Sequence, residues 1–242
     1  MLHHHPFAVE ALLARTTVLT YAAPAAALQP LLPPCLTLNA LDGRGFVAVA
    51  LVQTRQLRPR GLPAWLGQDF FLIGYRLLVR YTSAAGKRLR GLYILRSETD
   101  RRRMTLLGNM FTSYGYVTVD IQQHAAGSRQ RIHSTQSGLD IVVDHAEAAP
   151  ALPPGSPFAD WAQARRYAGP LPFTFSYHAP ERQVVIVQGR REEWAPQPVR
   201  VVAAEVPFLA QLTTEPLTLA SAFVTENIPY HWQKGRIEQW KG

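Results

Sequence analysis

The stretch FFLIGYRLLVRY at residues 70–81, followed by RLRGLYILRSETDRRRMTLLGNMFTSYGYVTVDI at residues 88–121, determines the predicted fold. Three apolar runs rich in β-branched and aromatic residues surround one short amphipathic segment, which is the pattern of strands with a helix between them. Arg76 interrupts the first run and places a charge where a strand is expected to be apolar. The stretch therefore predicts the architecture and marks one unusual side chain, but it indicates no reaction.

Alternation along residues 69–81 divides this strand into two faces. One face is entirely apolar and carries Phe71, Ile73, Tyr75, Leu77, Val79 and Tyr81. The other carries Phe70, Leu72, Gly74, Arg76, Leu78 and Arg80. Gly74 leaves room for a bulge or for the close approach of another group. Two interpretations of Arg76 stay open: a structural ion pair with a neighbouring carboxylate such as Glu98, or a cavity wall that binds an anion.

Strand patterns dominate the rest of the chain. They cover residues 9–21, 36–41, 45–55, 90–96, 114–123, 129–135, 139–145, 174–178, 183–190, 198–206 and 217–226. The sequence Asp-Gly-Arg-Gly at residues 42–45 predicts a tight hairpin. Short helices are expected at residues 24–32, 99–107 and 206–212, and from Ser156 to a stop at Gly169-Pro170. The predicted class is α+β, dominated by a large antiparallel sheet that is closed or strongly curled.

The helix at residues 99–107 has recognisable ends. Ser97 and Asp100 form a Ser-x-x-Asp arrangement that could satisfy free N–H groups at its start, and Gly108 is expected to stop it. The side chains expected to form its buried stripe are Met104, Leu107 and Phe111. Residues 114, 116, 118, 120 and 122 alternate onto one face of the next strand, which forms either a polar pocket wall or, more simply, the solvent side.

We expect one domain over residues 1–242, with an ordered core at about residues 9–239. The Pro-rich segment at residues 148–157 is the candidate linker. Similar strand patterns lie on both sides of it and no repeat is evident, so it is interpreted as a long loop within one domain. Homo-oligomer formation stays open.

Composition and motifs restrict the class of protein. The formal net charge is +8, but the basic residues are scattered, with Arg101-Arg102-Arg103 as the longest run, so we expect no nucleic-acid partner. No apolar run is long enough to span a bilayer, so we expect no membrane partner. Cys35 is the single cysteine, which fits a cytoplasmic location. Phosphate-loop, dinucleotide and metal-ligand spacings are absent, so neither a cofactor nor a metal is expected.

The order of these patterns resembles the domain of unknown function 2071 family of the acetoacetate decarboxylase-like superfamily. The resemblance covers about residues 9–239 and rests on a Leu-Pro-Pro turn near Pro33, the DGRG hairpin and the strand bearing Tyr75-Arg76. It continues with RGLYILRSETDRRRMTLLGN and with FTFSYHAPERQVVIVQGR before REEWAPQPV. The resemblance implies a cone-shaped closed β-barrel with a central cavity and a few peripheral helices.

Acetoacetate decarboxylases carry a nucleophilic lysine, activated by a second lysine and an apolar pocket, in a motif of the form Gly-Arg-Glu-x-x-Gly-x-Pro-Lys-Lys. The corresponding segment here is residues 108–117, in which only the first glycine matches and both lysines are replaced. The three lysines of the chain are Lys87, Lys234 and Lys241, in a Gly-flanked turn and near the C-terminal end. Decarboxylation through an imine is therefore not expected.

Three functional hypotheses remain. In the first, the cavity binds a small anionic organic molecule through Arg76, with Tyr116 and Glu98 as further ligand-binding candidates. In the second, the protein is a lysine-independent lyase or hydratase on a keto or carboxylic acid, using Tyr116 or Glu98 as acid or base. In the third, it is an interaction module whose barrel is filled with side chains.

Overall fold

The computed structural model describes residues 3–146, 150–168, 171–191 and 194–242. Its long strands are β1 (Val9–Pro24), β3 (Arg44–Pro59), β4 (Gln68–Thr82), β5 (Arg88–Thr99) and β14 (Thr218–Trp232). Shorter strands are β2 (Thr37–Leu38), β6 (Tyr116–Thr118), β7 (Gln122–Ala126), β8 (Arg129–Ser134), β9 (Leu139–Asp144), β10 (Phe173–His178), β11 (Gln183–Arg191), β12 (Gln197–Pro198), β13 (Arg200–Glu205) and β15 (Arg236–Gln239). The helices are α1 (Ala25–Leu28), α2 (Arg102–Phe111), α3 (Trp161–Ala168) and α4 (Pro207–Ala210), with 3₁₀ turns at Gln29–Leu31 and Ala64–Leu66.

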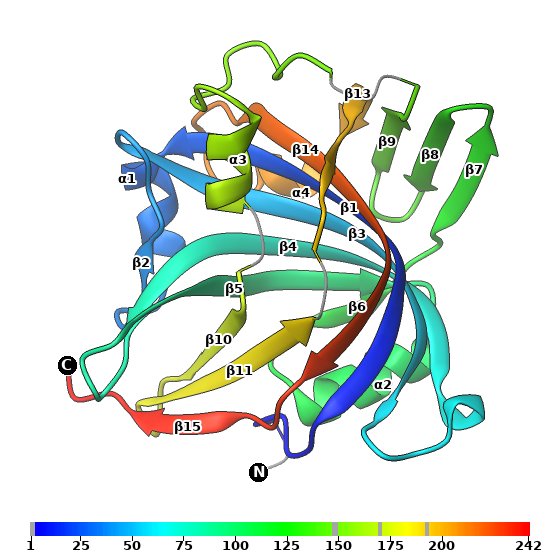
Figure 1. Ribbon diagram of the computed structural model, residues 1–242. Helices are drawn as coiled ribbons and strands as arrows, with labels where there is room; N and C mark the ends of the chain where they lie inside the picture. Colours follow the sequence, from blue (N-terminus) through cyan, green and yellow to red (C-terminus); the bar gives the residue numbers. More distant parts are fainter. Residues whose placement is uncertain (1–2, 147–149, 169–170, 192–193) are drawn as a thin grey trace.

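The strands form a large curled sheet and a small second one (Figure 1). The large sheet runs β12-β14-β1-β3-β4-β5-β10-β11-β15, and the small sheet runs β13-β9-β8-β7. A β-dominated α+β fold is thus confirmed. Expected strands at residues 36–41 and 114–123 are shorter than predicted, since only Thr37–Leu38 forms β2 and a break separates β6 from β7.

The pairings of the large sheet return to their starting strand. Besides pairing with β1, strand β14 pairs with β11 through Gly189–Trp232, Arg190–His231 and Arg191–Tyr230. Strands β1, β3, β4, β5, β10, β11 and β14 therefore form a continuous path of pairings, which we call the strand ring. The prediction of an antiparallel sheet is wrong at β5, because this strand pairs in parallel with both β10 and β6.

The DGRG segment forms the predicted hairpin. Leu41 and Arg44 exchange backbone hydrogen bonds of 2.9 and 2.8 Å across it. Asp42 and Gly43 both have positive φ angles, of 46° and 74°. A two-residue turn of this kind requires left-handed backbone at both positions, which explains the glycine.

Helix α2 differs from its prediction at both ends. It begins at Arg102 because residues 97–99 belong to β5, and its preceding residue, Arg101, makes no side-chain capping bond. Asp100 instead accepts a 2.8 Å hydrogen bond from the backbone N–H of Phe71. Gly108 does not stop the helix, which continues to Phe111. The predicted stop at Gly169-Pro170 lies outside the described residues, as do residues 148 and 149 of the expected loop.

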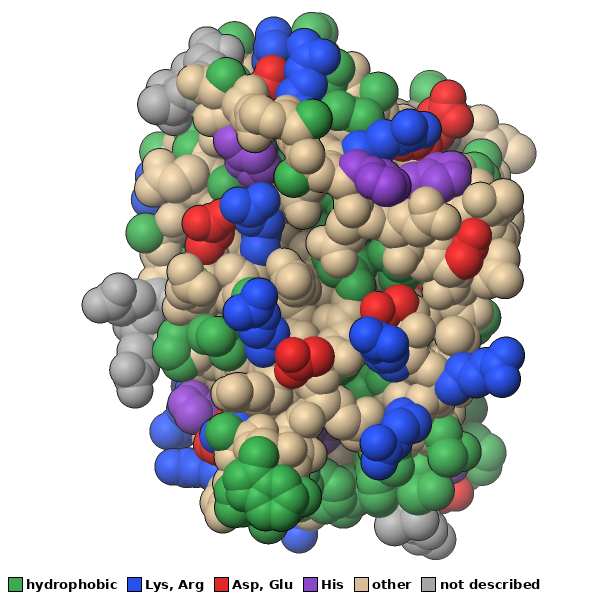
Figure 2. Space-filling model, turned by 90° about the vertical axis from the view of Figure 1, so that its right-hand side faces the viewer, with side chains coloured by type: hydrophobic (Ala, Val, Ile, Leu, Met, Phe, Trp, Pro, Cys, Tyr) green, Lys and Arg blue, Asp and Glu red, His purple; other side chains and the backbone are tan. Residues whose placement is uncertain are grey.

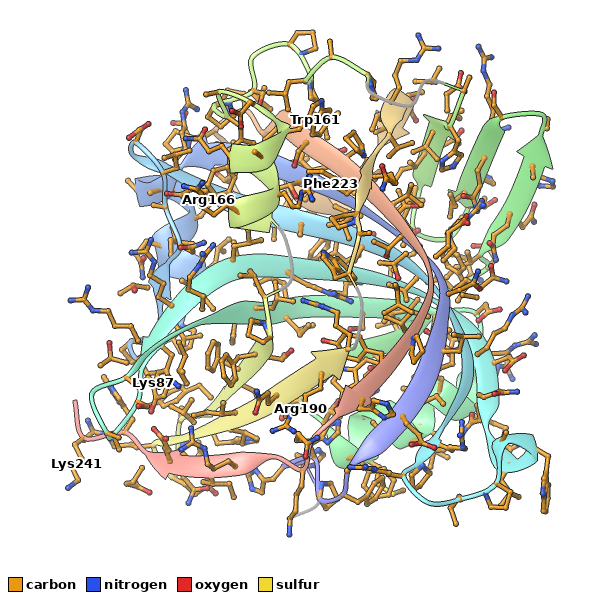
Figure 3. All side chains as sticks on the ribbon, in the orientation of Figure 1. Lys87, Trp161, Arg166, Arg190, Phe223 and Lys241 are labelled. Atoms are coloured by element: carbon orange, nitrogen blue, oxygen red, sulfur yellow. The ribbon has the colours of Figure 1, made fainter. Side chains whose placement is uncertain are left out.

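The two predicted faces of β4 pack against different partners. Phe71, Ile73, Tyr75, Leu77, Val79 and Tyr81 belong to a core that also includes Ile132, Leu139 and Ile141 of the small sheet and Leu209 of α4. A second core lies beneath α3. There the rings of Trp161 and of Phe223 of β14 pack edge to face, with their centroids 5.2 Å apart (Figure 3). The opposite face of β4, with Arg76, is turned away from the small sheet.

On the face shown in Figure 2, basic side chains lie interspersed with acidic and apolar ones. In the described part of the chain, no helix has the length and apolar character that crossing a bilayer requires.

Substitution of Gly91 tests the parallel junction between β5 and β10. A Cβ atom at Gly91 would collide with the carbonyl oxygen of Phe173 and the ring of Phe175, and both belong to packed strands that cannot yield cheaply. We expect Gly91→Ala to lower the free energy of unfolding by about 2 kcal/mol, measured by equilibrium urea denaturation. Arg88→Ala, at an exposed position of the same strand, serves as the control and should change it by less than about 0.5 kcal/mol. Equal effects of the two variants would contradict a tightly packed junction.

Candidate cavity site

All seven strands of the strand ring line one cavity of about 510 Å³. Their contributions include Leu13 of β1, Ala50 of β3, Arg76 of β4, Ile94 of β5, Thr174 of β10, Arg191 of β11 and Tyr230 of β14. One space therefore touches every strand of this path. Helix α2 lines it as well through Met104, Leu107 and Phe111, the predicted buried stripe. This volume is typical of small-molecule sites.

Cationic groups dominate the few charges of the cavity. Apolar side chains form most of its wall, and the charged lining residues are Arg58, Arg76 and Arg191. Arg58 is neutralised, because its Nη2 lies 2.6 Å from Oε1 of Glu10. No aspartate or glutamate belongs to the lining in the described residues. An anion would therefore meet attraction and little repulsion there.

The Arg76 guanidinium lies directly over Gly74, two residues earlier on the same face of β4. A Cβ atom at Gly74 would be 2.8 Å from Nε and 2.9 Å from Nη2 of Arg76, so the glycine provides the close approach expected from the sequence. The Nε atom is buried and has no hydrogen-bond partner among the described residues. Burial lowers the pKa of Arg76 from its ordinary value because the charged form loses hydration.

Three tyrosines line the cavity together with Arg76. Tyr114 and Tyr116 line the cavity with ring centroids 6.4 Å apart, and Tyr230 reaches it from β14. Burial raises the pKa of Tyr116 to about 12 and raises those of Tyr114 and Tyr230 as well. All three phenols are therefore neutral at pH 7 and can donate a hydrogen bond to a ligand.

The simpler interpretation of the alternating residues 114–122, a solvent-facing strand, is wrong at its first two positions. The ring of Tyr116 packs where Gly108 of α2 has no side chain, which explains a glycine inside that helix. Farther along, Thr118 Oγ1 lies 2.7 Å from Thr105 Oγ1 of α2. Asp120 accepts hydrogen bonds from Ser134 Oγ and the backbone of Gln136, at 2.8 and 2.9 Å, and Gln122 is exposed. Cavity and surface positions thus follow each other within one segment.

Glu98 is not the partner of Arg76 and does not line the cavity. Its carboxylate is 1% exposed and pairs with Arg96, with Nη2 to Oε1 at 2.9 Å. The hydroxyl of Tyr75 donates to its Oε2 at 3.1 Å. Burial raises the pKa of Glu98, while Arg96 and Tyr75 oppose this shift. The interpretation of an ion pair between Arg76 and Glu98 is therefore wrong, because Glu98 pairs with Arg96 on the opposite face of the sheet.

Lys87, Lys234 and Lys241 are all exposed, and none lines the cavity. Figure 3 shows Lys87 and Lys241 at the outer edge of the molecule, at the β4–β5 turn and the C-terminus. Among the described residues, no group of three or more His, Cys, Asp or Glu side chains could hold a metal ion.

The family is established by comparison with known proteins. The model of domain of unknown function 2071, described as an uncharacterized conserved protein, matches residues 11–228. The chain belongs to this family. No curated protein matches it.

Solved structures of acetoacetate decarboxylase-like proteins share the fold. Acetoacetate decarboxylase from Legionella pneumophila has a TM-score of 0.63 at 10% identity, covering 96% of this chain and 88% of that one. An acetoacetate decarboxylase-like enzyme from Sphingomonas wittichii has a TM-score of 0.61 at 12% identity, covering 97% and 93%. A third structure is the enduracididine biosynthesis enzyme MppR complexed with the condensation product of pyruvate and imidazole 4-carboxaldehyde. Its TM-score is 0.58 at 15% identity, and the match covers 96% of this chain and 88% of that one. The superfamily resemblance is confirmed at the level of fold.

Among the cavity residues that sequence reasoning did not identify are Arg191, Trp194 and Tyr230. Arg191 follows the predicted end of its strand, and Tyr230 lies beyond the predicted end of β14 at residue 226. The alternation of Ile228, Tyr230 and Trp232 continues the β14 pattern and could have indicated the longer strand. Nothing in the sequence indicated that β11 and β14 pair.

Replacement of Glu98 separates its structural role from ligand binding. Glu98→Gln removes the charge that pairs with Arg96, so we expect a loss of about 2 kcal/mol in the free energy of unfolding, measured by urea denaturation. Glu215→Gln, at an exposed site, is the matched control and should change it by less than about 0.5 kcal/mol. A Glu98 variant of unchanged stability would show that the pair contributes nothing to the fold.

Proposed function

We propose that the cavity binds a small organic carboxylate with an apolar body, held at its carboxylate by Arg76. The observation that carries this proposal is the Arg76 guanidinium over Gly74, whose buried Nε has no acceptor in the described residues. A ligand carboxylate would supply the missing acceptor through charge-assisted hydrogen bonds, and the apolar walls would bury the rest of the molecule.

We further propose that the strand ring is the closed barrel expected from the sequence and that it works without a Schiff-base lysine. Exposure of all three lysines supports the second point. The cavity volume of about 510 Å³ argues against a barrel filled by its own side chains. Among proteins of similar fold, MppR has been observed complexed with pyruvate, which is a small carboxylate.

A lyase or hydratase acting without an imine is the alternative function. Tyr116 favours it, because a neutral phenol beside a guanidinium can donate a proton to a substrate oxygen. A pKa of about 12 makes Tyr116 a poor base at neutral pH. Glu98, the other candidate acid or base, lies outside the cavity.

Arg76→Leu tests the proposal. Since no described carboxylate pairs with Arg76, its removal leaves no buried charge behind, and the free energy of unfolding should change by less than about 1 kcal/mol. Stabilisation of the protein by small carboxylates, measured as a thermal shift, should disappear. Gly74→Ala, which displaces the guanidinium, should weaken the same thermal shift.

Arg88→Leu is the matched control, because it removes one exposed guanidinium from the neighbouring strand. It should leave the carboxylate-induced shift intact. A stability loss of about 3–5 kcal/mol in Arg76→Leu, together with no carboxylate that protects the wild type, would instead assign Arg76 to a buried structural ion pair.

Borohydride trapping tests the role of lysine. Reduction of an imine fixes a keto acid covalently to the lysine that formed it. Because the lysines lie outside the cavity, we expect the protein mass to stay unchanged after borohydride treatment with acetoacetate or pyruvate, measured by intact-protein mass spectrometry. A specific adduct at any of the three lysines would refute the lysine-independent proposal.

A further inference from the structure

A second cluster of hydrogen-bond donors lies in the same cavity, around Arg191. Its guanidinium carbon is 4.1 Å from the ring centroid of Trp194 and 5.7 Å from that of Tyr230. Two aromatic rings thus fix the position of the cation through cation–π contacts. All three side chains line the cavity.

This cluster lacks acceptors within the described part of the chain. Arg191 forms no ion pair there, and the Nε1 of Trp194 is buried without a hydrogen-bond partner. Burial lowers the pKa of Arg191, as it does for Arg76. Leaving such donors unpaired costs free energy, which a ligand acceptor would recover.

Tyr230 connects the two clusters. Its ring centroid lies 5.7 Å from the guanidinium carbon of Arg191, its hydroxyl is seated where Gly189 of β11 has no side chain, and its side chain lines the cavity that Arg76 also lines. The ring also packs against Trp232, with centroids 4.4 Å apart. The tyrosine is therefore held in place beside Arg191, in the same cavity that Arg76 lines.

We propose that the ligand carries two carboxylates joined by a short apolar chain, one bound by Arg76 and the other by Arg191 with Trp194. This inference rests on the proposed function and names its ligand class. Two donor clusters within one mainly apolar cavity fit a dicarboxylate better than a monocarboxylate, which would leave one guanidinium without an acceptor among the described residues. The hydroxyl of Tyr230 donates a hydrogen bond to an oxygen of the same ligand.

Matched pairs of acids test this inference. We would titrate succinate, glutarate and adipate, and in parallel butyrate, valerate and hexanoate, into the wild type, Arg76→Leu and Arg191→Leu by isothermal calorimetry. At least one dicarboxylate should bind about tenfold or more tightly than the monocarboxylate of equal length, because the second carboxylate gains charge-assisted hydrogen bonds. Arg191→Leu should abolish this difference while monocarboxylate affinity stays the same.

Arg190→Leu is the control, since the adjacent Arg190 is exposed and the variant has the same net charge as Arg191→Leu. Arg191→Gln provides a second variant if Arg191→Leu fails to fold. Equal affinity for mono- and dicarboxylates, or an equal loss of both in Arg191→Leu, would overturn the second subsite. If the monocarboxylates still depended on Arg76, the proposed function would survive. Absence of binding by every acid would overturn both.

Discussion

Burying a guanidinium inside an apolar cavity is the constraint on which this site depends. The charged guanidinium of Arg76 loses hydration when it is buried, and no carboxylate among the described cavity residues pairs with it. A glycine at residue 74 leaves space for the guanidinium, and three neutral phenols line the same cavity. Such an arrangement costs folding free energy that no described contact repays, and this unrepaid cost is the basis of the proposed ligand binding.

The sequence predicted correctly which face of β4 carries Arg76. The candidate ion-pair partner of Arg76, Glu98, was wrong. Strict alternation along residues 69–81 placed Arg76 opposite the core face, because the period of a strand is fixed by backbone geometry. The choice of Glu98 as partner failed for the same geometric reason. Glu98 pairs with Ile73 in the sheet register, so its side chain points to the core face with Tyr75 and Arg96. A local pattern fixes the face of a residue, whereas its partner depends on which strands meet.

The remaining cavity residues depended on long-range contacts that no local pattern encodes. Tyr114 and Tyr116 turn inward because α2 presents Gly108 to the Tyr116 ring, a fit between two elements. Arg191 and Tyr230 meet because β11 and β14 pair at their ends. At 10–15% identity, the structures of similar fold define the scaffold and leave the chemistry of its cavity to the residues of each chain.

The strand ring is unequal in strength around its circumference. Among the described residues, β10 joins β5 through three residue pairs and β11 joins β14 through three, whereas β1 and β3 share fourteen. Local opening costs least where the fewest backbone hydrogen bonds break. The β10–β11 hairpin is therefore the part of the ring that opens most easily, and its amide protons should exchange with solvent before those of β1 and β3. Thr174 and Arg191 line the cavity from these two strands. Opening of this hairpin therefore displaces two residues that line the cavity, and faster amide exchange in β10 and β11 than in β1 and β3 would detect it.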